Sequence, residues 1–244
     1  MRSAWRAELL KIATVRGLWL SAVLAAAAIP AVSLLVVSTG GLGPRDTATS
    51  GAATGSLIGL LAFGAWGATF AAGEYAQHTI VVSLATVPRR AVLYTAKLTA
   101  TATTAGVGAV VASTVALLTV LAVTPRGEHE LGDPAALAGV VLAVMAVAVC
   151  GAAVGMLTRS VSGSIGIVAL ALLAPKAAAD LLGGLQRWIV GASPGTVITQ
   201  IVGGAQLPTE QAYPRGAWAA AATMVLVAAA VGVAGSVSFI RRDG

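Results

Sequence analysis

Residues 134–158 read PAALAGVVLAVMAVAVCGAAVGMLT and contain no charged side chain. A helix needs about 20 consecutive apolar residues to cross the hydrocarbon core of a bilayer, which is about 30 Å thick. A charged side chain at the centre of such a helix costs about 2.5–3.5 kcal/mol on the insertion scale, so a clean stretch of this length does not arise by chance. The stretch predicts a membrane-spanning helix, and other parts of the chain repeat its pattern.

The whole chain has the composition of a membrane protein. Of its 244 residues, 57% are hydrophobic and 10% are charged, whereas an ordinary soluble domain carries about 25% charge. Five of the seven longest uncharged intervals run 25 residues or more. This composition excludes a soluble enzyme built around one buried core.

We predict an all-α membrane protein with a single transmembrane domain over residues 1–244. In lipid the backbone must satisfy its own hydrogen bonds, so the long apolar segments are expected to be helices. Six of them are predicted to span the bilayer, at about residues 18–38, 54–73, 98–123, 135–157, 160–182 and 216–240.

The uncharged interval 188–209 is not among the predicted spans. Its prolines, glycines and polar side chains oppose a spanning helix, and a further crossing would put the basic C-terminal end outside. The outer segment 183–215 is therefore predicted to form short helices that dip into the outer leaflet. Trp188 and Tyr213 stand where interfacial aromatic residues would anchor them.

Basic residues divide unequally between the two sides of the membrane. With both termini inside, the inner side holds ten Lys and Arg residues and three acids, and the outer side holds five and six. The net charge is then +7 inside and −1 outside, which sums to the +6 of the chain. Cytoplasmic loops carry the excess of Lys and Arg, so both termini are predicted to be cytoplasmic. The same rule accounts for the positive charge without nucleic acid, which is not an expected partner.

Residues 1–17, MRSAWRAELLKIATVRG, precede the first span. A basic start followed by an apolar run resembles a signal peptide, but the apolar run here is longer than the usual 7–15 residues. We expect instead a helix on the inner membrane face, with Trp5, Leu9 and Ile12 on one side at helical spacing.

Several kinds of chemistry lack the residues they need. The single cysteine, Cys150, excludes a disulfide framework, and two histidines far apart in the chain exclude a multi-histidine metal cage. None of the three lysines lies in a phosphate-binding GxxxxGK[ST] sequence. The chain is therefore expected to bind no cofactor and to hydrolyse no ATP by itself.

The loop between the second and third predicted spans carries the most information about function. Residues 73–98 read GEYAQHTIVVSLATVPRRAVLYTAKL. Glu74 closes the second span, Pro88 interrupts a short helix, Arg89 and Arg90 follow, and Lys97 opens the third span. One interpretation is that these are boundary charges that obey the positive-inside rule.

A second interpretation comes from a resemblance. Together with the two chain ends, the loop resembles the membrane subunit of type-2 ABC exporters, the six-span bacterial permeases that export drugs, bacteriocins and polysaccharides. That family has a Glu-x-x-x-Gly-Thr run, then Leu, Pro and Arg, and a Lys at the start of the third span. The matching residues here are Glu74, Thr79, Leu84, Pro88, Arg90 and Lys97.

The chain ends and one departure complete the comparison with that family. Glu8-Leu9-x-Lys11 and Arg242-Asp243 are similar to the two ends of the family's members. His78 stands where the family usually has Gly, which puts the local turn in doubt but not the architecture.

The resemblance implies that residues 74–97 form a coupling helix that docks on a separate ABC ATP-binding subunit. ATP and Mg would be bound by that partner in the bacterial plasma membrane. The implied contact residues are Glu74, Thr79, Leu84, Pro88, Arg89, Arg90 and Lys97. Glu74 is expected to cap or pair near Arg89, Arg90 or Arg6.

A single six-span chain is usually half of such a transporter, so a second copy or a close relative is an expected partner. Gly55-x-x-x-Gly59 and Gly151-x-x-x-Gly155 would allow close helix approach. Chance spacing in a chain with 29 glycines is the alternative.

Phe63, Trp66 and Phe70 share one face of the second span. They either pack against protein or lipid, or they line a substrate path. The second interpretation predicts a hydrophobic or amphipathic cargo. Two function classes therefore remain: a permease subunit of an ABC exporter, and a membrane scaffold or immunity protein that binds a ligand without active transport.

Overall fold

The structure is a computed structural model that describes residues 2–87, 89–125, 129–203 and 207–241. The described residues form helices joined by turns and loops and contain no strand. The α-helices are α1 Arg2–Thr14, α2 Arg16–Ser38, α3 Ala48–Ala53, α4 Ser56–Ala76, α5 Ile80–Thr86, α6 Arg90–Val123, α7 Leu137–Thr158, α8 Val161–Ala177, α9 Gln186–Ile189, α10 Pro194–Val202 and α11 Ala217–Arg241. Four short 3-10 turns are η1 Pro134–Ala136, η2 Ala179–Leu181, η3 Gly183–Leu185 and η4 Thr209–Gln211.

Five segments of the described chain are long and apolar enough to cross a membrane. They are Arg16–Ser38, Ala48–Ala76, Arg90–Val123, Pro134–Thr158 and Ala217–Arg241. The all-helical membrane fold is thus confirmed, with five candidate spans where six were predicted. The remaining predicted span, 160–182, contains α8, which has 17 residues and ends at Ala177. At 1.5 Å per residue α8 is about 26 Å long, slightly less than the hydrocarbon core.

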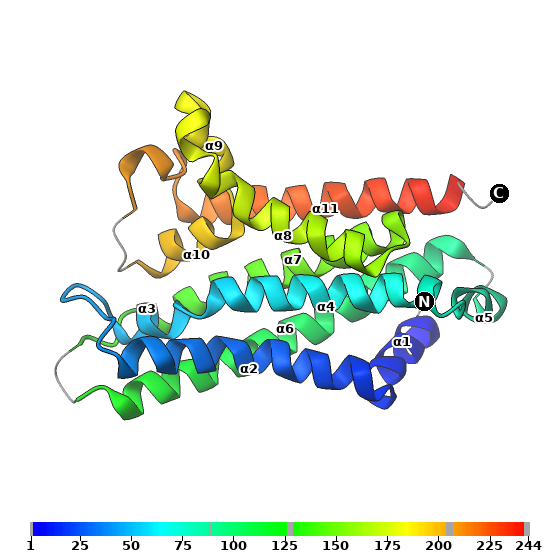
Figure 1. Ribbon diagram of the computed structural model, residues 1–244, viewed down its shortest axis with the longest axis horizontal. Coiled ribbons are helices and arrows are strands. Elements are labelled where there is room, and N and C mark those ends of the chain that lie inside the picture. The colour runs from blue at the N-terminus through cyan, green and yellow to red at the C-terminus, as the bar shows by residue number, and fades with distance from the viewer. Residues whose placement is uncertain (1, 88, 126–128, 204–206, 242–244) are drawn as a thin grey trace.

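The long helices lie side by side along the long axis of the molecule, with α4 and α7 at the centre (Figure 1). Most of the apolar window in these two spans is buried, 67% for the α3–α4 segment and 61% for α7. The corresponding figures for α2 and α11 are 17% and 28%. The outer helices therefore present their leucines and valines outward, as expected for helices in contact with lipid.

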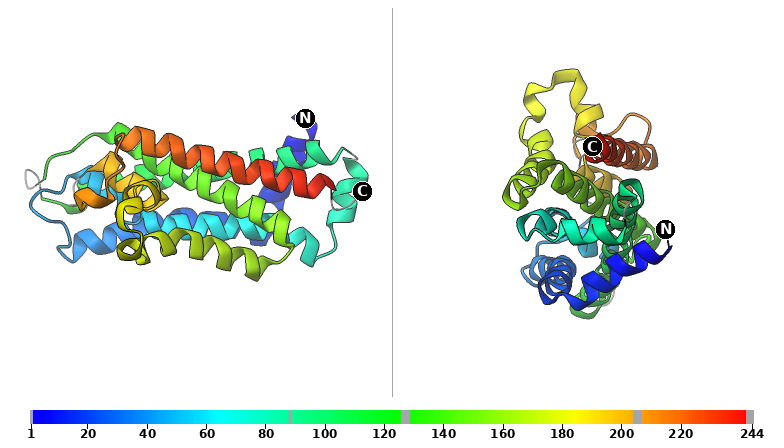
Figure 2. Two further views of the ribbon diagram at one scale, coloured as in Figure 1. Left: turned by 90° about the horizontal axis from the view of Figure 1, so that it is seen from above. Right: turned by 90° about the vertical axis from the view of Figure 1, so that its right-hand side faces the viewer.

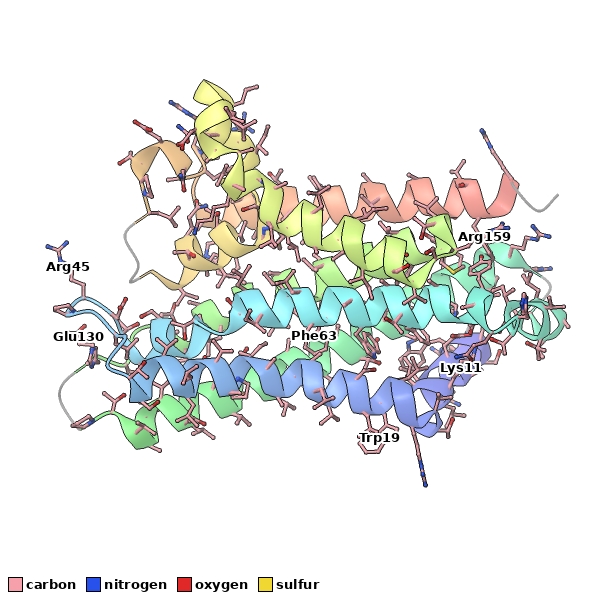
Figure 3. All side chains as sticks on the ribbon, viewed as in Figure 1. Lys11, Trp19, Arg45, Phe63, Glu130 and Arg159 are labelled. Atoms are coloured by element: carbon pink, nitrogen blue, oxygen red, sulfur yellow. The ribbon has the colours of Figure 1, made fainter. Side chains whose placement is uncertain are left out.

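The two ends of the bundle differ in charge. Both chain ends lie at the end that carries α1 and α5, and the loops before α3 and after α6 lie with α9 and α10 at the other (Figures 1 and 2). Figure 3 shows Lys11 and Arg159 at the α1–α5 end, and Arg45 and Glu130 at the opposite end. The charges that the sequence assigned to the two sides therefore separate in space in the same way.

Glycines bring α4 and α7 into backbone contact. A Cβ atom on Gly67 would overlap the carbonyl oxygen of Ala148, and one on Gly151 would overlap that of Gly64. Gly155 faces the carbonyl oxygen of Ala68 at 2.8 Å from its ideal Cβ position. The close approach predicted for the Gly151-x-x-x-Gly155 motif is confirmed, and it occurs within one chain.

The second Gly-x-x-x-Gly motif faces a different neighbour. Ideal Cβ atoms on Gly55 and Gly59 would overlap Ile29 of α2. The helix is broken here between α3 and α4, and Ser33 of α2 reaches the break: its hydroxyl donates to the carbonyl oxygen of Ala52 at 2.9 Å and accepts from the N–H of Gly55 at 3.3 Å. These bonds satisfy backbone groups that have no water to bond to in a membrane.

The described part of the segment 183–215 forms short helices, as predicted, and its location in the outer leaflet stays a prediction. Trp188 and Tyr213 meet edge to face with their ring centroids 5.3 Å apart. Gln200 of α10 holds the segment together, since its side chain donates to the carbonyl oxygen of Gly191 at 2.9 Å and accepts from the N–H of Tyr213 at 3.0 Å. No helix among the described residues of this segment is long enough to cross a bilayer.

The α4–α7 contact predicts opposite effects for one substitution at two positions of α4. Gly67→Ala should lower the free energy of unfolding by about 1–3 kcal/mol, because the added methyl forces the two backbones apart. Gly73→Ala is the matched control, since no atom lies within 4 Å of its ideal Cβ position. It should be neutral or stabilise by up to about 1 kcal/mol through helix propensity. Denaturant titration in mixed micelles measures both, and equal effects would contradict the close contact.

Candidate functional site

The N-terminal helix packs its apolar side on the bundle. Ala4, Glu8 and Ile12 are buried at intervals of four residues and so share one face of α1. Trp5 and Leu9, beside that face, pack against the main hydrophobic core. The side predicted to be apolar therefore contacts α6 and α2 of the same chain. That arrangement carries Glu8 into the interior, while the location of α1 on the inner membrane face remains a prediction.

Four charged side chains, from α1, α4 and α6, meet at the buried face of α1. The Nζ atom of Lys97 lies 2.9 Å from Glu8 Oε2 and 2.9 Å from Glu74 Oε1. The Nζ atom of Lys11 lies 3.1 Å from Glu8 Oε1 and also contacts Glu74 Oε1. Each lysine thus bridges the same two glutamates, and we call these four residues the charge cluster.

The charge cluster is neutral and largely removed from solvent. The side chain of Lys97 is 0% exposed, and those of Glu8 and Glu74 are 5% and 7% exposed. Burying an ion costs several kcal/mol unless a partner of opposite charge accompanies it. Two cations and two anions meet that condition, and the ring of Phe70 lies 4.4 Å from the Lys97 nitrogen as a further contact.

Lys11 is the one member near the surface, with 31% of its side chain exposed. Burial lowers its pKa, but the hydrogen bond and charge of Glu74, helped by Glu8, outweigh that effect and leave the pKa above its usual 10.5. A lysine with a raised pKa stabilises the folded state fully below pH 10.5 and loses this contribution only as the pH rises through the higher value. At neutral pH the side chain is therefore charged.

The short helix α5 is connected to the charge cluster through Ser83. The hydroxyl of Ser83 lies 3.4 Å from Lys11 Nζ and 3.4 Å from Glu74 Oε2. At the other end of the turn, the N–H of Thr79 donates to the carbonyl oxygen of Glu74 at 2.9 Å. Leu84 packs against a small apolar cluster that includes Tyr94 and Phe239. The inner side of α5 is thus joined to α4, α6 and α11.

The outer side of α5 is bare. No residue of α5 is buried, and Val81 and Val82 are 67% and 65% exposed. Figure 2 shows α5 at the tip of the bundle, at the end that carries both termini. Val81 and Val82 thus form an apolar surface that no described residue of the chain buries.

The turn before α5 contains His78 in an unfavourable backbone conformation. His78 has a φ of 57°, in the left-handed region, where glycine is favoured because it has no Cβ atom. The turn forms with histidine in that conformation. Histidine at this position therefore carries a local strain that glycine would not.

The predicted contact residues have different positions. Glu74 and Lys97 lie in the charge cluster, Thr79 and Leu84 make the inner contacts of α5, Arg89 is exposed, and Arg90 begins α6. Pro88 and the Arg242-Asp243 end lie outside the described residues. Lys97 does not open a helix, because α6 begins at Arg90 and buries it two turns further on.

A partner for Glu74 was expected among Arg6, Arg89 and Arg90. The cations that hold it are Lys11 and Lys97. Sequence reasoning did not assign roles to Glu8, Lys11 and Ser83. The available signal was the Glu8–Lys11 pair, three residues apart and next to the apolar face of a predicted helix, where opposite charges meet.

The aromatic residues of the candidate substrate path are buried in the core. Phe63, Trp66 and Phe70 are at most 2% exposed. Trp66 stacks on Phe70, and its ring N–H donates to the carbonyl oxygen of Leu18 at 3.0 Å. They act as packing residues in this conformation, and a role in a substrate path stays a prediction.

No family model matches the sequence, and no curated protein matches it. Among the described residues, no group of three or more His, Cys, Asp or Glu side chains could hold a metal ion.

Removing one cation from the charge cluster should destabilise the fold strongly. Lys97→Met leaves two buried carboxylates with one lysine, so we expect a loss of about 3–5 kcal/mol in the free energy of unfolding. The double variant Lys97→Met with Glu8→Gln should recover part of it, because it restores neutrality. The control Lys176→Met removes an exposed lysine and should change stability by less than about 1 kcal/mol. Equal losses in Lys97→Met and Lys176→Met would refute the buried cluster.

Residue 78 gives a test of the turn. His78→Gly should be neutral or stabilise by up to about 1 kcal/mol, whereas His78→Val should destabilise by about 1–2 kcal/mol, because a β-branched side chain is disfavoured at positive φ. Thermal unfolding in detergent compares the two variants with the wild type. A more stable valine variant would mean that the turn has a different conformation.

Proposed function

We propose that this chain is the membrane-spanning subunit of an ATP-driven ABC exporter. In this proposal the chain crosses the membrane six times, with α8 as the fifth and shortest crossing. The position of α8 beside α4 and α7 supports that assignment, as does the outward exposure of Leu170 and Leu173 along it. Both termini then lie in the cytoplasm of a bacterial cell, on the basic side of the plasma membrane.

The observation that carries the proposal is the two-sided character of α5. Its outer face exposes Val81 and Val82, and its inner face contacts the charge cluster through Ser83. A helix that transmits force from a partner needs a surface to dock on and a stiff connection to the spans. The α5 helix has both, at the end of the molecule where the ATP-binding subunit would sit.

The charge cluster would carry the motion from α5 into the spans. Glu74 ends α4, Lys97 lies in α6, and Glu8 lies in α1, so a shift of α5 pulls on three helices together. Because separating these charges in a dry interior is costly, the helices would move as one unit rather than slide past each other. This chain would supply the substrate path and the helix that transmits the motion, and ATP and Mg would bind in the partner.

A complete transporter would contain a second copy of this chain or a close relative. The cargo in this proposal is a hydrophobic or amphipathic molecule. A path lined by Phe63, Trp66 and Phe70 would require a conformation in which α4 separates from both α2 and α6. In the present one Trp66 bonds to Leu18 of α2, and the two phenylalanines lie against α6.

The first test is purification of the tagged chain from its native membrane in mild detergent, followed by mass spectrometry. A stoichiometric partner with a GxxxxGK[ST] sequence is the expected result. Recovery of the chain alone, under conditions that preserve other transporter complexes, would favour a scaffold or immunity role.

The docking surface gives a sharper test. Val81→Asp with Val82→Asp should reduce recovery of the ATP-binding subunit by about tenfold or more, since two apolar contacts are replaced by desolvated charges. Leu131→Asp is the control, because Leu131 is also exposed but follows Glu130, which Figure 3 shows at the opposite end of the bundle. Full recovery with the valine variant, in a chain that elutes as a single species, would exclude α5 as the docking site.

A further inference from the structure

A groove runs between α8 and α11 and has α7 as its floor. It has a volume of about 520 Å³ and is open along one side. Figure 2 shows α8 and α11 on either side of α7 when the bundle is seen from above. Leu170 on α8 and Leu226 on α11 are exposed on the two helices that form the walls. In a membrane the open side of the groove would therefore face hydrocarbon.

Both hydroxyls that line the groove donate their protons within the protein. Ser193 donates to the carbonyl oxygen of Val190 at 2.7 Å, and Thr223 donates to that of Ala219 at 2.9 Å. Alanine, valine, leucine and isoleucine side chains make up most of the remaining surface. The lining therefore favours an occupant that is hydrocarbon over most of the groove.

The size of the groove suits one extended hydrocarbon chain. Its volume is about 520 Å³, and it lies between α8 and α11 over the floor that α7 forms, so a single acyl chain can lie along it.

The end of the groove fits a lipid headgroup. Trp188 of α9 lines it there, and tryptophan side chains prefer the boundary between hydrocarbon and headgroups. The preceding residue in α9, Arg187, is exposed and cationic, so it could complement a lipid phosphate.

We infer that the α8–α11 groove is a lipid site, which holds one acyl chain of a bilayer phospholipid with its phosphate beside Arg187. The lipid fills the space that the short helix α8 leaves open against α11. This inference depends on the chain lying in a membrane and is independent of whether the chain is an exporter.

The test uses the full-length chain in vesicles that contain a phosphatidylcholine with a photoactivatable diazirine in its acyl chain. On illumination the probe should label Cys150 and Val154, which line the groove from α7. Mass spectrometry locates the modified residues. Labelling of Leu226, on the outer surface, reports ordinary contact with surrounding lipid.

Two variants that fill the groove from opposite walls are Ala171→Phe and Val227→Phe. Each should reduce labelling of Cys150 and Val154 by about tenfold, the effect of displacing roughly two buried methylene groups. Leu170→Phe is the matched control on α8, because that side chain does not line the groove. Unlabelled floor residues in the wild type, with Leu226 labelled, would overturn the inference. So would floor labelling that neither filling variant reduces.

Discussion

Four charges meet at one end of the bundle, three of them buried, and they set the constraint on which that end depends. Lys97 has no contact with solvent, so it is stable as a cation only while Glu8 and Glu74 remain beside it. The two glutamates belong to α1 and α4, and the lysine to α6. The positions of these three helices are therefore fixed relative to one another by electrostatics as well as by packing.

The same constraint gives α5 its character. Ser83 ties its inner side to the charge cluster, and Leu84 adds an apolar contact, yet the helix has seven residues and buries none of them. An isolated helix of this length is not stable in water. Its stability must come from the contacts at its inner side, which leaves its two exposed valines available to a partner.

The centre of the bundle follows a different principle. Between α4 and α7 there is no charge and little side-chain volume, and glycines let the backbones approach until carbonyl oxygens meet the opposite helix. In lipid there is little hydrophobic gain from bringing helices together, so close van der Waals contact has to supply the attraction. The bundle is thus held at its centre by the close α4–α7 contact and at one end by the charge cluster. The helix α5 lies outside both and remains exposed.

Much of the fold could be predicted from the sequence because hydropathy is a property of contiguous residues. In a membrane each helix satisfies its own backbone hydrogen bonds. A stretch such as 134–158 can therefore be recognised as a spanning helix from its own residues alone. Charge counting predicted in the same way which residues would share an end. The predicted span 160–182 ran past the end of α8 because alanines and leucines continue beyond Ala177 into turns, and hydropathy does not distinguish such turns from helix.

The candidate site was predicted only in part. The sequence by itself singled out Glu74 and Lys97, two charges at the edges of apolar stretches. Only the tertiary structure decided that they meet each other and Glu8, because residues 8, 74 and 97 come together through the packing of three helices and not through any local spacing. The same holds for Gly67 and Ala148, and for the aromatic residues of α4: a one-dimensional pattern gives the face of a helix, but the neighbour of that face exists only in the assembled bundle.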